Sequence, residues 1–128
     1  MQSATTRLFR QVIAGLLYPA GPGSRWEAFE WPGTGGLPNP DWVHRRGFHR
    51  ASAPTRQQTV EEFFAPLEQE RDGDRATATR YQTLSATVRE HLSNAIVVRV
   101  GTGKVTVYVV GRTADGAWAG LKVTANET

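Results

Sequence analysis

The sequence predicts an α+β domain, an α/β/α sandwich in which helices cover both faces of a mainly antiparallel, four-stranded sheet. The first observation is a succession of three strand-like segments at the end of the chain. The second is that both faces of the middle segment are apolar enough to pack against other elements. Val105, Val107 and Val109 lie on one face, and Thr106, Tyr108 and Val110 lie on the other. Such a strand needs two covering layers, and helical periodicity elsewhere in the chain supplies them.

The three expected strands are residues 95–100, 104–110 and 118–124. Short glycine-containing segments separate them, which favours an antiparallel meander. Asp115 and Gly116 are typical of a tight hairpin turn, because they tolerate the positive φ angles that such a turn requires. A fourth strand is expected over the aromatic segment 26–31, which Pro32 ends.

Four helices are expected: about a dozen residues before Pro19, and residues 39–46, 59–65 and 75–92. In the first, apolar side chains recur at helical spacing: Leu8, Phe9, Val12, Ile13, Leu16 and Leu17. Asn39 is suited to cap the second helix and Gly47 to end it. Thr59 and Glu62 match a capping box, in which each side chain satisfies a free backbone N–H at the start of a helix.

A chain of 128 residues fits a single domain, and we assign residues 1–128 to one. The absence of cysteine excludes disulfides, thiolate zinc sites and cysteine nucleophiles. No apolar run approaches the roughly 18–20 residues that a membrane span requires. Residues 12–17, preceded by Arg7 and Arg10, resemble a short signal core but also fit a helix stripe. We therefore expect a cytoplasmic protein, with secretion as the alternative.

No constellation in the sequence predicts catalysis or a bound metal, so we expect neither an enzyme nor a cofactor. His44 and His49 are five residues apart in a Gly/Pro-rich region, which is not a zinc-ligand spacing, and are expected to be solvated. His91 is expected to pack on its helix face. The paired acids lie on loops, where two carboxylates are not held apart in a pocket. The segment 33–36 is rich in glycine but lacks the following helix of a phosphate loop.

The formal net charge is +3, from 15 basic and 12 acidic residues, and this balance modestly favours acidic partners. One basic segment combines arginines with aromatic residues: Trp42, Arg45, Arg46, Phe48 and Arg50, with Arg56 beyond. Arginines with interleaved aromatic rings are used to bind single-stranded nucleic acid. The competing interpretation is a solvated basic loop whose aromatic rings anchor it to the core.

Four separated blocks of the sequence stand out: residues 15–19 (Gly-Leu-Leu-Tyr-Pro), 25–31 (Arg-Trp-Glu-Ala-Phe-Glu-Trp), 59–64 (Thr-Val-Glu-Glu-Phe-Phe) and the tail 105–128. In this order they resemble the nuclease A inhibitor-like family, whose founding member blocks a sugar-non-specific DNA/RNA endonuclease. The resemblance implies an α/β/α fold and a non-catalytic, monomeric protein that binds and inhibits a metal-dependent endonuclease. The alternatives are nucleic-acid binding through Arg45, Arg46, Arg50 and Arg56, or a retained fold with a different protein partner.

The resemblance also implies a site. In such inhibitors the C-terminal Thr and an acid in the loop after the first helix are thought to reach into the nuclease cleft, toward a magnesium-type metal. Thr128 matches the first position, but residues 20–24 contain no carboxylate, and the next acid is Glu27 on the expected strand. The expected partner-binding residues are Asn126, Glu127 and Thr128 of the tail, Gly21 and Ser24 of the loop, and Asp72 and Asp74 of an acidic patch.

Overall fold

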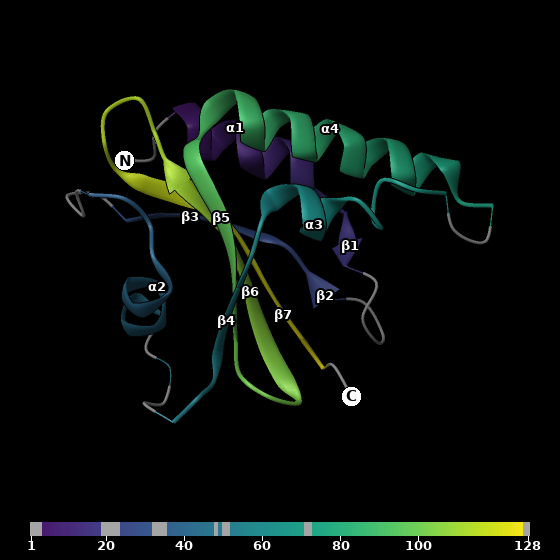
Figure 1. Cartoon of the computed structure of the whole chain (residues 1–128). Helices are drawn as coiled ribbons and strands as arrows, with labels where there is room; N and C mark the ends of the chain where they lie inside the picture. Colours follow the sequence, from purple (N-terminus) through teal and green to yellow (C-terminus); the bar gives the residue numbers. More distant parts are fainter. Residues whose placement is uncertain are drawn as a thin grey trace.

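The computed structural model describes residues 4–18, 24–31, 36–47, 49, 52–70 and 73–126. Its elements, drawn in Figure 1, are α1 (Ala4–Ile13), β1 (Leu17–Tyr18), β2 (Ser24–Arg25), β3 (Glu27–Trp31), α2 (Pro40–Arg46), β4 (Thr55–Gln58), α3 (Val60–Phe64), α4 (Arg75–His91), β5 (Ser93–Val100), β6 (Lys104–Arg112) and β7 (Trp118–Asn126). The mixture of helices and an antiparallel sheet agrees with the predicted fold class.

The main sheet has the strand order β3-β7-β6-β5-β4, and every neighbouring pair in it is antiparallel. The predicted meander of β5, β6 and β7 is confirmed. The predicted number of four strands is too low, because β4 adds a fifth strand by pairing with β5. β4 has the sequence Thr-Arg-Gln-Gln, so it carries no apolar alternation by which it could be recognised.

The first helix is shorter than its apolar spacing suggests. α1 ends at Ile13, and Gly15 follows with φ +74, a left-handed conformation that helix residues do not adopt. Leu17 therefore belongs to β1 rather than to the helix, and its side chain is 47% exposed. β1 pairs with β2 in a separate two-stranded sheet, where a loop was expected around Ser24. The predicted helix thus becomes a helix followed by a small hairpin.

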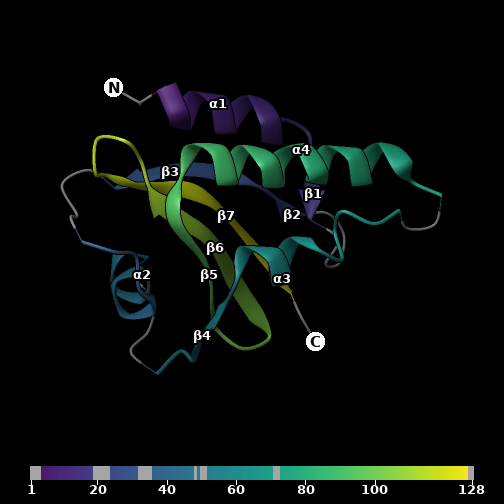
Figure 2. The same ribbon diagram turned by 45° about the horizontal axis from the view of Figure 1, so that its top comes forward.

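Helices lie on both faces of the main sheet, and the alternation of side chains assigns each residue to one of them. The major face is covered by α1, α3 and α4, and its core includes Phe9, Phe64, Leu84, Val107, Val109 and Leu121. Of the described helices, α2 is the one that lies over the minor face, whose core includes Phe29, Val43, Val98, Val100, Tyr108, Val110 and Trp118. Figures 1 and 2 show α1 and α4 side by side, and α2 apart from them across the sheet.

The predicted helix caps are confirmed in atomic detail. The backbone N–H of Glu62 donates to the Thr59 hydroxyl at 3.0 Å, and the Thr59 N–H donates to the Glu62 carboxylate at 3.1 Å. Asn39 accepts a hydrogen bond of 3.0 Å from the Trp42 N–H at the start of α2. Each cap satisfies backbone groups that a helix start leaves free.

The β6–β7 turn differs from the predicted tight turn. Gly116 has φ +88, but Asp115 has no positive φ. The turn is closed by two hydrogen bonds, from the Gly116 N–H to the Thr113 carbonyl at 3.0 Å and from the Thr113 N–H to the Ala117 carbonyl at 2.9 Å. A longer turn with one left-handed glycine is the next most common way to join antiparallel strands.

The contact between β6 and β7 leads to a prediction at Gly120. A Cβ atom at Gly120 would overlap the carbonyl oxygen of Val109 on β6. Gly120→Ala is expected to lower the free energy of unfolding by about 2–3 kcal/mol, because the strands must move apart. Chemical denaturation measures this loss. The exposed Thr124 of the same strand supplies the control, since Thr124→Ala is expected to cost less than about 1 kcal/mol. Equal losses in the two variants would contradict the explanation.

Candidate functional site

The last strand, β7, leads to the C-terminal residues of the candidate site. β7 pairs with β6 as far as Asn126, which lies opposite Lys104, and Val123 and Ala125 are buried on the major face. The strand is therefore held by backbone hydrogen bonds and by packing almost to the end of the sequence. Asn126 is the last described residue, and its side chain, Glu127 and Thr128 lie outside the described part of the structure.

The hairpin after α1 lies beside this strand. Ser24 belongs to β2, which pairs with β1 and also contacts β7. Tyr81 of α4 holds the hairpin in place, because its hydroxyl donates to the Leu17 carbonyl at 2.7 Å and accepts from Trp26 Nε1 at 3.1 Å. Burial raises the pKa of Tyr81 to about 12, so its hydroxyl keeps its proton. The structure thus brings Ser24 close to the last strand, while Gly21 lies outside the described residues.

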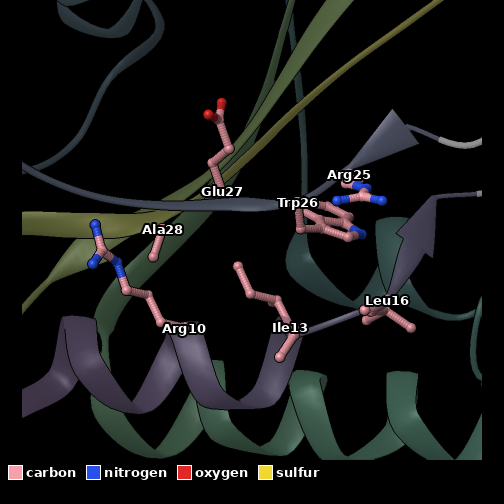
Figure 3. Close-up of a pocket in the computed structure, with 9 residues that line it drawn as sticks. Arg10, Ile13, Leu16, Arg25, Trp26, Glu27 and Ala28 are labelled. Carbon is pink, nitrogen blue, oxygen red and sulfur yellow. The ribbon is translucent and has the colours of Figure 1, made fainter.

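A pocket of about 380 Å³ separates α1 from the start of β3, and Arg10, Ile13, Leu16 and Trp26 are among the residues lining it. Figure 3 shows Ile13 extending toward the strand, whereas the carboxylate of Glu27 points away from α1. Glu27 lies opposite Lys122 of β7. The acid that follows the hairpin is therefore directed to the minor face, not into this pocket.

Asp74 of the expected acidic patch has a structural task. Its carboxylate accepts hydrogen bonds from the Thr77 N–H at 3.0 Å and from the Thr77 hydroxyl at 2.7 Å, which caps α4. These bonds hold the pKa of Asp74 below its usual value, the backbone bond contributing most. Asp74 remains exposed, so its charge still faces solvent. Asp72 lies outside the described residues.

The basic residues of the nucleic-acid hypothesis are divided between two faces. Arg45 and Arg46 lie on α2, over the minor face, and their guanidinium carbons are each 5.8 Å from an indole centroid, Trp42 for Arg45 and Trp31 for Arg46. Arg56 lies on β4 opposite Arg99, which contacts Phe63 on the major face. The structure therefore does not gather Arg45, Arg46 and Arg56 on one surface. Arg50 lies outside the described residues.

The expectation of solvated histidines is wrong for His44 and His49. His49 Nε2 lies 2.6 Å from the hydroxyl of Tyr108 on β6, a hydrogen-bond distance, and the two histidine rings are 5.9 Å apart. His44 Nε2 is buried and has no hydrogen-bond partner among the described residues. Burial lowers the pKa of His49 first, and the neighbouring charges of His44 and Lys122 lower it further. His49 thus ties the segment after α2 to the sheet in its neutral form.

The sequence matches the family model described as nuclease A inhibitor-like protein over residues 3–128. The chain belongs to the nuclease A inhibitor-like family. The match covers both the hairpin after α1 and the last strand, so the family assignment includes the whole candidate site. A search of curated proteins finds no match. Among the described side chains, no three His, Asp or Glu residues are grouped as metal ligands.

Sequence reasoning missed one feature of this nuclease A inhibitor-like chain, the polar end of its minor face. Lys104 and Lys122 are the only lysines in the sequence, and both face this side of the sheet beside the end of β7. Alternation along β6 and β7 gives a signal, since Lys104, Thr106 and Tyr108 share one face with Lys122 and Thr124. Of the helices that the structure describes, none is both long and apolar enough to cross a membrane.

The lowered pKa of His49 predicts a pH dependence of stability. In the unfolded chain His49 binds a proton as the pH falls below about 6.5, the ordinary pKa of histidine. In the folded chain it binds the proton only at a lower pH. The contribution of neutral His49 is therefore present above this pH and is lost as the pH falls from about 6.5 toward the lowered pKa. Denaturation at pH 8 and pH 5 is expected to give a smaller difference for His49→Gln than for the unchanged chain. An unchanged difference would assign the pH dependence to other groups.

Proposed function

We propose that this chain is a non-catalytic inhibitor of a metal-dependent, sugar-non-specific nuclease, and that it acts by placing Thr128 in the active cleft of that enzyme. The family match over residues 3–128 is the observation that carries the proposal. The family takes its name from nuclease inhibition, and its match reaches the last residue of the sequence. The other partner-binding residues in this proposal are Asn126, Glu127, Gly21, Ser24, Asp72 and Asp74.

The geometry of β7 supports this mechanism. The strand stays paired to β6 as far as Asn126, so Thr128 follows two positions after a residue that the sheet holds in place. Two residues reach at most about 7 Å, which limits the positions that the tail can sample. A segment that is already ordered loses less conformational entropy when it binds. A tail on a paired strand is therefore well suited to enter a narrow cleft.

The chemistry of Thr128 supports it as well. Its hydroxyl and its terminal carboxylate offer oxygen atoms, and the hard divalent cations of such nucleases prefer oxygen ligands, directly or through bound water. The metal in this interaction belongs to the nuclease. The inhibitor supplies a negatively charged group where the enzyme would otherwise hold a phosphate.

Two features distinguish this chain from the inhibitor that the resemblance describes. Residues 20–24 supply no acid, so one of the two groups directed at the metal is missing. The net charge is +3, whereas the known type of inhibitor is acidic. Both features predict weaker binding to a nuclease whose substrate groove is basic. They favour a target whose surface around the cleft is more acidic than that of the founding enzyme.

Deletion of Thr128 tests the mechanism. We expect the deletion to weaken inhibition of DNA cleavage by about a hundredfold or more, the scale of a dominant interface residue. The melting temperature should stay nearly unchanged, since the deletion leaves β7 (Trp118–Asn126) and its pairing with β6 intact. Cleavage is followed at several ratios of inhibitor to enzyme, with DNA in excess. Inhibition that tracks the amount of enzyme supports cleft binding, whereas inhibition that disappears when DNA is in excess indicates that the chain coats the nucleic acid. Full inhibition by the deleted chain would falsify the tail mechanism.

The missing acid gives a second prediction. Ser24 lies on β2, which contacts β7, so Ser24→Asp introduces a carboxylate beside the strand that leads to Thr128. We expect this variant to inhibit more strongly, by about tenfold, the effect of one added charge-assisted contact of about 1.4 kcal/mol. Thr83→Glu adds the same charge on the exposed side of α4 and should leave inhibition unchanged. Equal effects of the two variants would mean that only net charge matters.

A further inference from the structure

The polar end of the minor face forms a regular array beside the end of β7. Along the two strands, Lys104 lies opposite Asn126, Thr106 opposite Thr124, and Tyr108 opposite Lys122. Residues opposite each other share a face of the sheet, so Lys104 and Lys122 stand on either side of the central threonine pair. The two threonine hydroxyls are 3.1 Å apart and bind each other. Both lysines of the chain therefore flank one small polar surface.

A pocket opens on this surface, with a volume of about 790 Å³. Its lining includes Lys104, Thr106 and Thr124 of β6 and β7, and His49, Ser52 and Pro54 of the segment between α2 and β4. Lys122 does not line the pocket, but it lies opposite Tyr108, whose hydroxyl is 2.6 Å from Nε2 of the lining residue His49. In Figures 1 and 2 the end of β7 and the β5–β6 turn lie at the same end of the sheet.

Among the described residues, neither Lys104 nor Lys122 lies within ion-pair distance of a carboxylate. Glu27 of β3 is the cross-strand neighbour of Lys122 on the minor face, so it offsets part of the charge of Lys122. Lys104 lies opposite Asn126, an uncharged residue. Two hydroxyls are left to donate hydrogen bonds to an anion, that of Ser52 and one of the Thr106–Thr124 pair, since the other threonine donates to its partner. The pocket thus has the charge and the donors to bind a carboxylate.

We propose that this pocket, which we call the lysine pocket, binds an acidic side chain on the surface of the target nuclease, beside the cleft that receives Thr128. The inference rests on the proposed function and extends it. Because Lys104 pairs with Asn126, two residues before Thr128, a nuclease that encloses the tail also covers the lysine pocket. A positively charged second contact also fits a target that is more acidic than usual, as the net charge of the chain suggests.

Charge reversal tests the lysine pocket. The double variant Lys104→Glu/Lys122→Glu is compared with Arg7→Glu/Arg89→Glu, which changes the net charge equally on exposed helix positions of the major face. Binding to a metal-dependent, sugar-non-specific endonuclease is measured by surface plasmon resonance at low and moderate salt. We expect the lysine variant to raise Kd by about tenfold or more at low salt, chiefly through slower association, and the arginine variant to change it by less than about threefold. Melting temperatures identify variants that fail to fold. Lys104→Gln/Lys122→Gln removes both charges without reversing them, and its Kd is expected to lie between those of the unchanged chain and the charge-reversed variant.

The outcomes separate the inference from the proposed function. Failure of the unchanged chain to bind the nuclease overturns the proposed function, and the lysine pocket with it. Binding that is lost on deletion of Thr128 but equal in the lysine and arginine variants overturns the lysine pocket alone. A third measurement uses a fluorescent DNA oligonucleotide without nuclease. If the lysine variant loses only the binding of this DNA, the pocket takes phosphate, and the assignment to a protein carboxylate is wrong.

Discussion

The pairing of β6 with β7 is the interaction on which the rest of the structure depends. Val105, Val107 and Val109 are buried on one face of β6, and Tyr108 and Val110 on the other. Complete burial of one such aliphatic side chain contributes about 1.5–3 kcal/mol. A slip of one residue would turn each of these side chains to the opposite face. Because one face of β6 carries three valines and the other carries Lys104, Thr106 and Tyr108, such a slip would bury polar groups. This fixes the register from Arg112 opposite Trp118 to Lys104 opposite Asn126.

This fixed register determines what the end of the chain can present. It places residue 126 beside Lys104, brings both lysines to one surface, and leaves the polar threonine pair open where α2 no longer covers the sheet. The hairpin of β1 and β2 is held against α4 by the hydrogen bond from the Tyr81 hydroxyl to the Leu17 carbonyl. The core of the major face thus depends on helices that are far apart in the sequence. The polar end of the minor face carries residues of the proposed interface.

The sequence predicted most strongly the elements that carry their own chemical signal. The alternation of β6, the Thr59 capping box and the Asn39 cap are local, and the structure confirms each. β4 was missed because Thr-Arg-Gln-Gln is extended only through its pairing with β5. The end of α1 was misplaced because Leu16 and Leu17 continue the helical spacing beyond Gly15. The contact of His49 with Tyr108 joins residues 59 positions apart, and no local pattern announces it.

The polarity of β4, which hid it from the sequence analysis, also affects the outer edge of the sheet. An edge strand offers unpaired backbone groups to any passing extended chain, and proteins limit this hazard with short, polar or charged edges. β4 spans only Thr55–Gln58 and carries Arg56 and two glutamines. A second copy would find little apolar surface and few backbone groups there for strand addition. The edge at β4 thus resists strand addition by another chain and the aggregation that would follow from it.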